Sequence, residues 1–145
     1  MNKNQQKFAH YAQLINQIVT DTEAEQDKMS PKFETLKQAL LAGTLADFDS
    51  AEYATIKTLF ADGTAHYQQM LAQLQQAKVP AKLMGNHKLL TAAFADFVAG
   101  CDAMVTSLHE NPSTFDEAAF SEAEADQDVA TSKLMKYIQK ISLMA

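Results

Sequence analysis

Apolar residues recur along the chain at alternating spacings of three and four positions, the pattern of helices that each bury one face. Four such stripes follow one another without a slip in spacing. They are Phe8, Ala12, Ile15, Val19, Thr22, Gln26, Met29, Phe33, Leu36, Leu40; then Tyr53, Ile56, Phe60, Gly63, Tyr67, Met70, Leu74, Ala77; then Leu83, His87, Leu90, Phe94, Phe97, Cys101, Met104, Leu108; and finally Phe120, Ala123, Gln127, Ala130, Leu134, Tyr137, Ile141, Met144. The sequence therefore predicts four long helices.

The breaks between the stripes contain residues that end and start helices. Gly43 follows the first stripe, where a glycine is expected just past a helix end. Asp49 or Ser50 is placed to cap the second helix, Pro80 suits the first position of the third, and a hydroxyl within 113–114 can cap the fourth. Short connections make long consecutive helices antiparallel. The predicted fold is an all-α, up-down-up-down four-helix bundle that forms one domain over residues 1–145.

A proline interrupts the first stripe at Ser30-Pro31. Ser-Pro is also a helix-start signal, so this segment can be two helices over about residues 5–29 and 31–42. The stripe nevertheless passes from Met29 to Phe33 without a change of phase. This continuity favours a first helix that is kinked at Ser30-Pro31, or broken there into two nearly collinear pieces.

Composition narrows the classes of partner. The chain has 18 acidic and 12 basic residues, a net charge of −6, and it contains neither Arg nor Trp. An acidic chain without Arg is a poor candidate for binding nucleic acid or an anionic membrane. No run of 18 consecutive apolar residues predicts a membrane span, and the first residues lack the apolar core of a signal peptide. With Cys101 as its one cysteine, the protein is expected to be cytoplasmic.

Some stripe positions depart from simple hydrocarbon side chains and suggest a pocket. Gly63 costs about 1 kcal/mol relative to Ala in a helix interior. Folding the helices about their turns places Gly63 level with Phe97, with Gln127 near that level and Gln26 facing the second helix. Either Gly63 makes room for Phe94 or Phe97, or these residues border a ligand cavity. The two glutamines either form a buried polar layer or reach water at the edge of the stripe.

The chain lacks the constellations of familiar catalytic bundles. No Glu-x-x-His motif is present for a di-iron site, no Cys-x-x-Cys-His for covalent haem, and no glycine-rich phosphate loop. We therefore expect no cofactor and no enzymatic activity. Asp62 and His66 lie four residues apart and can share a cation, but two ligands are too few for Zn²⁺, so a solvated face is the preferred interpretation. His87 is expected to be a satisfied interior histidine and Cys101 a small buried hydrophobe.

Three functional hypotheses follow. The first is a non-enzymatic bundle that acts through protein–protein contact or self-association, because Leu89, Val98 and Val105 widen the apolar arc of the third helix. An acidic stretch over residues 89–132 holds nine of the 18 acids and no lysine, and it either is a solvated face or steers a basic partner. The second is a bundle that binds a small apolar ligand near Gly63. The third is a metal-dependent enzyme that uses Asp62 and His66.

Overall fold

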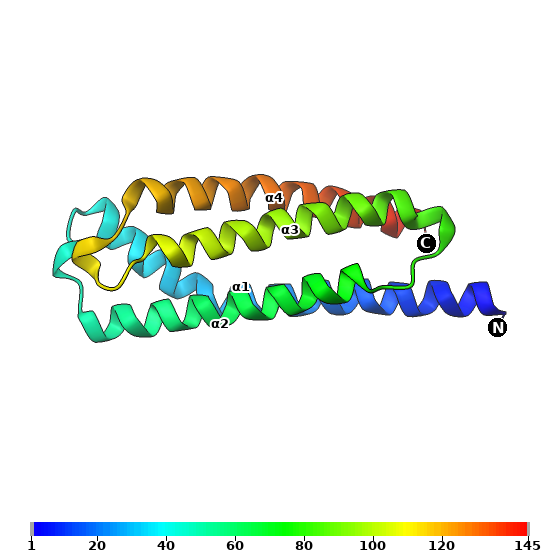
Figure 1. Ribbon diagram of the computed structural model, residues 1–145, viewed down its shortest axis with the longest axis horizontal. Coiled ribbons are helices and arrows are strands. Elements are labelled where there is room, and N and C mark those ends of the chain that lie inside the picture. The colour runs from blue at the N-terminus through cyan, green and yellow to red at the C-terminus, as the bar shows by residue number, and fades with distance from the viewer. Residues whose placement is uncertain (1, 145) are drawn as a thin grey trace.

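The computed structural model describes residues 2–144 and contains four long helices within that range. They are α1 (Lys3–Leu41), α2 (Ser50–Gln75), α3 (Met84–Ser107) and α4 (Glu117–Met144). Figure 1 shows that consecutive helices run in opposite directions and that both ends of the chain lie at the same end of an elongated bundle. Three short 3-10 turns lie in the connections, at Leu45–Asp47, Ala81–Leu83 and Pro112–Thr114. The predicted four-helix bundle is confirmed.

Two of the residues predicted to end or cap helices, Gly43 and Asp49, have these roles in the structure. Gly43 adopts a φ of 72°, a left-handed conformation that glycine reaches without a steric penalty, directly after α1. The Asp49 carboxylate caps α2 by accepting a hydrogen bond from the backbone N–H of Glu52 at 2.8 Å. The predicted cap of α4 within 113–114 is wrong, because those residues belong to a 3-10 turn. Asp116 accepts from the backbone N–H three residues further on, at 3.0 Å, and caps this helix instead.

Helix α1 continues through Pro31 as one helix of 39 residues. The alternative of two helices is therefore wrong, while a kink at Ser30-Pro31 stays a prediction. Proline removes one backbone donor, so the carbonyl of Asp27, on an exposed residue, loses its helical partner. The hydroxyl of Thr35 donates to the carbonyl of Pro31 at 2.9 Å, one turn later.

The predicted stripes match the buried positions well in α2, α3 and α4, but not in the first half of α1. In the third stripe every position from Leu83 to Leu108 is buried. In α1 the predicted positions Ile15 and Leu36 are buried. Tyr11, Ile18 and Glu25 are also buried, each one residue before the predicted Ala12, Val19 and Gln26. Gln26 is exposed, so of the two alternatives it reaches water at the edge of the stripe. Both registers keep the three-four spacing, and the larger side chains at 11 and 18 take the interior.

Helix α3 is the most deeply embedded of the four. Ten of its 24 residues are buried, against five of the 39 residues of α1. By length and apolar composition the stretch Ala81–Ser107 is sufficient to cross a membrane. Within the bundle much of this apolar surface faces other helices. Val98 is buried and Val105 partly buried, whereas Leu89 is 48% exposed.

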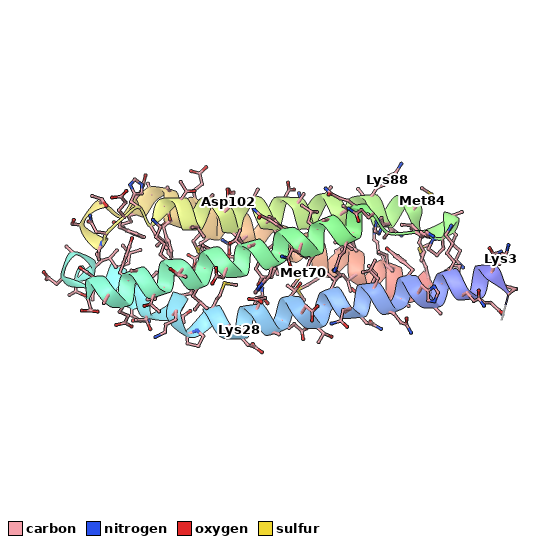
Figure 2. The ribbon with its side chains drawn as sticks, turned by 60° about the horizontal axis from the view of Figure 1, so that its bottom comes forward. Lys3, Lys28, Met70, Met84, Lys88 and Asp102 are labelled. Atoms are coloured by element: carbon pink, nitrogen blue, oxygen red, sulfur yellow. The ribbon has the colours of Figure 1, made fainter. Side chains whose placement is uncertain are left out.

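Small residues let α3 and α4 approach closely. A Cβ atom added at Gly100 would lie only 2.9 Å from Cγ of Gln127 and 3.4 Å from its backbone nitrogen. Ala93, Ala123 and Ala130 are buried nearby in the core. The backbones of α1 and α4, by contrast, approach each other far less closely. Side chains such as that of Met70 point into the bundle, while those of Lys88 and Asp102 point away from it (Figure 2).

Candidate functional site

A hollow lies between α1 and α4. Its volume is about 450 Å³, and α2 and α3 supply its floor. A second hollow of about 210 Å³ lies between the same two helices. The two share Gln26 and Phe97 as lining residues, so they neighbour each other along the bundle. We call the pair the α1–α4 groove. It exists because α4 packs closely against α3 and leaves space on its other side.

The floor of the larger hollow is apolar and largely aromatic. It includes Phe60 and Tyr67 from α2, and Phe97, Cys101 and Met104 from α3, all buried. The rings of Tyr67 and Phe97 meet edge to face with their centroids 5.0 Å apart, an arrangement that aromatic pairs favour. These residues belong to the second and third stripes, so the helical periodicity that builds the core also builds the floor.

Acidic residues form the rim of the groove. Around the two hollows the lining residues include five acids and no lysine, namely Glu23, Asp27, Glu34, Glu124 and Asp128. One lysine reaches this rim from α1: both carboxylate oxygens of Glu124 accept hydrogen bonds from Nζ of Lys37, at 2.8 and 2.7 Å. The hydrogen bond from Glu124 raises the pKa of Lys37 above its ordinary value; burial opposes this shift, and the charges of Glu124, Glu34 and Asp128 add to it.

The four residues predicted to border a pocket do not all reach it. Gln26, Phe97 and Gln127 line the larger hollow, with Gln26 at its exposed edge. Gln127 is half-buried and donates from Nε2 to the carbonyl of Gly100 at 3.0 Å, so the predicted layer of paired glutamines is wrong. Gly63 is buried but is not among the lining residues.

The space at Gly63 is filled by α1 and not by the aromatic side chains of α3. A Cβ atom added there would lie 2.6 Å from Sδ of Met29 and 3.5 Å from Oε2 of Glu25. The prediction that Gly63 makes room for Phe94 or Phe97 is therefore wrong. Because Met29 itself lines the larger hollow, Gly63 influences the groove through this one flexible side chain.

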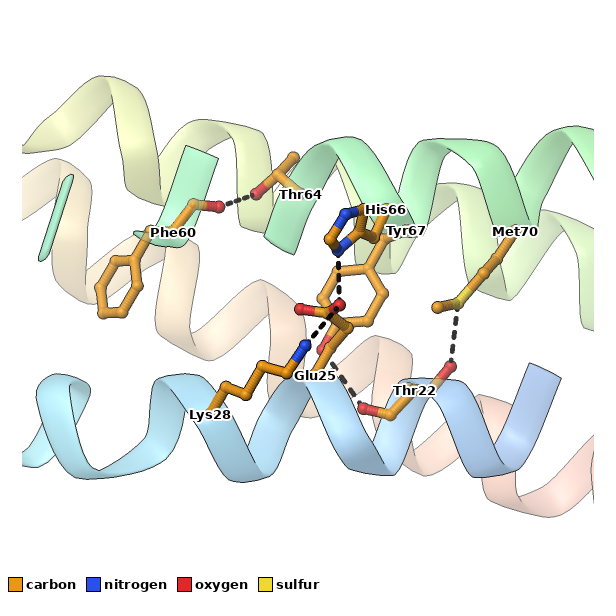
Figure 3. A network of polar contacts seen from close by, with 8 residues as sticks. All are labelled: Thr22, Glu25, Lys28, Phe60, Thr64, His66, Tyr67 and Met70. Atoms are coloured by element: carbon orange, nitrogen blue, oxygen red, sulfur yellow. Dashed lines mark hydrogen bonds and ion pairs between the residues drawn. The ribbon is translucent and has the colours of Figure 1, made fainter. Parts of the chain in front are cut away.

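A polar contact between α1 and α2 involves a residue that the sequence pattern missed. Oε1 of Glu25, which is only 8% exposed, lies 2.5 Å from Nδ1 of His66 and 3.6 Å from Nζ of Lys28 (Figure 3). On the same face, the hydroxyl of Thr22 donates to the sulfur of Met70 at 3.5 Å. Glu25 stands in phase with Ile18 and Tyr11. The register of α1 that contains Tyr11 and Ile18 also contains Glu25, so this second register was the signal in the sequence that pointed to Glu25.

The weak metal site suggested by Asp62 and His66 does not gain a third ligand. His66 turns its Nδ1 to Glu25 on α1, and Asp62 is exposed. Asp96 and Asp126 line a different hollow between α3 and α4. Among the described residues no group of three or more His, Cys, Asp or Glu side chains converges on one point.

His87 is a satisfied interior histidine, as predicted. Its Nε2 lies 2.9 Å from the carbonyl of Leu74, and its Nδ1 lies 2.7 Å from the hydroxyl of Tyr11. Because a carbonyl only accepts, Nε2 carries the proton and Nδ1 accepts from Tyr11. Burial raises the pKa of Tyr11 to about 12, which keeps this hydroxyl a donor. The contact joins α1 to α2 and α3 through one imidazole ring.

Cys101 is buried and unpaired by any disulfide, as predicted. Burial raises the pKa of its thiol to about 12, and the charge of Asp102 adds to the shift. Burial also raises the pKa of Tyr67, with smaller contributions from Cys101 and Glu25. Both side chains in the floor of the groove are therefore protonated at neutral pH. They offer an apolar surface and no nucleophile.

Comparison of the chain with protein-family models, with curated proteins and with solved structures gave no match.

Proposed function

We propose that this protein is a non-enzymatic binding protein that holds a small apolar ligand in the α1–α4 groove. The observation that carries the proposal is the hollow of about 450 Å³ with its aromatic floor. Small-molecule sites commonly have volumes of roughly 300–1,000 Å³ and are lined mainly by apolar and aromatic side chains with a few polar groups at the edge. The larger hollow has a volume in this range and an aromatic floor, and eight of its 15 lining residues are polar or charged.

The chemistry of the lining favours binding over catalysis. A general base or nucleophile needs a partner within hydrogen-bond reach that activates it. The floor instead carries the protonated thiol of Cys101 and the protonated phenol of Tyr67, whose hydroxyl donates to the carbonyl of Thr22 at 3.4 Å. Glu124, the best-held acid of the rim, is paired with Lys37. This set of side chains can hold a ligand but is not arranged to activate it.

Titration with the neutral fluorophore N-phenyl-1-naphthylamine tests the proposal, because its emission rises in apolar surroundings. We expect saturable binding at one site. Gln26→Trp should weaken this binding at least about tenfold, since Gln26 lines both hollows and an indole there occupies ligand space.

Gln13→Trp is the matched control. Gln13 is an exposed residue of the same helix outside the groove lining, so this variant should bind the probe like the unmodified protein. Absence of saturable binding, or equal binding by Gln26→Trp and the unmodified protein, would contradict the proposal. Circular dichroism of both variants establishes that they keep the helical fold.

A second candidate function, association through protein contact, is favoured by two exposed apolar side chains near the start of α3. Met84 is 46% exposed and Leu89 is 48% exposed. Sedimentation over a range of concentrations tests self-association, and Leu89→Glu should shift the protein toward the monomer. A monomer at every concentration would count against self-association and would leave the groove proposal unchanged.

A further inference from the structure

We propose that the ligand of the α1–α4 groove is an amphiphilic organic cation, whose apolar body lies on the aromatic floor and whose ammonium group lies at the acidic rim. This inference rests on the proposed function and adds the charge of the ligand to it. It is supported by the negative charge of the side chains around the hollow and by the ion pairs that the neighbouring lysines form with other acids.

The negative charge of the rim is only partly neutralised, by the ammonium group of Lys37. Of the four acids around the larger hollow, only Glu124 forms an ion pair; within residues 2–144, Asp27, Glu34 and Asp128 form none. Acids from two helices thus face the same opening. A cation placed there gains from all of them, whereas an anion is repelled.

The lysines of α1 closest in sequence to these acids are directed elsewhere. Lys28 lies 3.6 Å from Glu25, which faces His66 on α2, and Lys32 lies 3.7 Å from Glu52 on α2. On α1, Lys28 and Lys32 therefore lie toward α2, whereas Asp27 and Glu34 border the groove. Lys37 is the lysine of this helix that pairs across the groove, with Glu124 on α4.

Lys37 already places one ammonium group at this rim. Its Nζ is held by both carboxylate oxygens of Glu124 at 2.7 and 2.8 Å, in the field of Glu34 and Asp128. The same ammonium group lies over an aromatic ring, since Nζ is 5.7 Å from the centroid of Phe33, a residue of the groove lining. An aliphatic chain that ends in an ammonium group, next to aromatic and acidic side chains, is the chemistry that we infer for the ligand.

The size of the groove favours a small molecule over a helical peptide. A helix with its side chains is roughly 10 Å wide, so three turns fill on the order of 1,200 Å³. The two hollows measure about 450 and 210 Å³. A single amphiphile with a short apolar body fits this space without displacing α1 or α4.

Competition against N-phenyl-1-naphthylamine tests the inference with three displacers of equal chain length: n-octylamine, n-octanol and octanoate. We expect n-octylamine to displace the probe at about tenfold lower concentration than octanoate, with octanol between them. Because the rim is exposed to solvent, this preference should shrink at high ionic strength.

The variant Asp27→Asn/Glu34→Gln/Asp128→Asn removes the unpaired acids of the larger hollow and should abolish the preference, which is measured as the ratio of displacing concentrations within the same variant. The matched control is Asp62→Asn/Asp102→Asn/Glu110→Gln. It removes three exposed acids outside the groove lining, changes the net charge equally and should keep the preference.

The outcomes separate the two proposals. If the probe binds but the three displacers are equally effective, or octanoate is preferred, the cation inference is wrong and the groove proposal stands. The inference is also wrong if both triple variants lose the preference to the same extent, or if a basic amphipathic peptide displaces the probe more tightly than n-octylamine. If the probe does not bind at all, the proposed function fails and the inference fails with it.

Discussion

The two sides of α4 differ in how they meet their neighbours. Toward α3, buried alanines and Gly100 bring the backbones together, and Gln127 bonds directly to the carbonyl of Gly100 at 3.0 Å. Toward α1, the helices are joined by the ion pair of Lys37 with Glu124 and by the stacked rings of Phe33 and Phe120, and they border a groove. Small side chains at facing positions let two helices pack closely. Where such residues are lacking, as between α1 and α4, space remains between the helices. The same helix is thus part of a rigid pair and one wall of a binding site.

The largest effect should come from filling the close contact between α3 and α4. Gly100→Leu is expected to destabilise the protein by about 3 kcal/mol in chemical denaturation, because the backbone of α4 at Gln127 stands against the new side chain and cannot move alone. Gly85→Ala is the control. A Cβ atom there meets nothing within 4 Å, so this variant should be neutral or more stable by up to about 1 kcal/mol. A small loss for Gly100→Leu would mean that α3 and α4 are not rigidly paired.

An intermediate effect is expected where α1 is attached to the other helices. Tyr11→Phe removes the donor that Nδ1 of the buried His87 accepts from, and should cost about 1–3 kcal/mol in the free energy of unfolding. Tyr137→Phe is the same chemical change at a half-buried residue whose hydroxyl forms no hydrogen bond within residues 2–144, and should stay within about 0.5 kcal/mol. Equal losses for the two variants would show that the contact does not anchor α1.

The smallest effect should arise at the other buried glycine. Gly63→Leu is expected to cost about 1 kcal/mol, well below Gly100→Leu. The obstacle is the end of the Met29 side chain, which can turn, and leaving glycine improves helix propensity by several tenths of a kcal/mol. Because Met29 lines the hollow, the variant should also weaken binding of N-phenyl-1-naphthylamine. Thermal unfolding and the same titration measure both effects. A loss of stability as large as that of Gly100→Leu would show that α1 and α2 are packed as tightly at Gly63 as α3 and α4 are at Gly100.

Sequence periodicity predicted the core best where one register was clearly more apolar than its neighbours. In α3 each position of the stripe is buried. In α1 two registers one residue apart both kept the spacing, and the choice of Ala12 and Gln26 over Tyr11 and Glu25 was wrong. An interior acid is unexpected from composition alone, since Glu is buried only when it has a partner. That partner, His66, lies 41 positions away in the sequence.

The amino-acid sequence by itself determined the number of helices, most of their ends, their antiparallel order and the buried faces of three of them. These features depend on neighbours within a few residues, through caps, turns and the 3.6-residue period. Only the tertiary structure decided which pair of helices packs closely, which side chain fills the space at Gly63, and where a groove with an acidic rim remains. Those depend on the sizes and charges of side chains on different helices, and a pattern along one helix carries no information about the distance to the next.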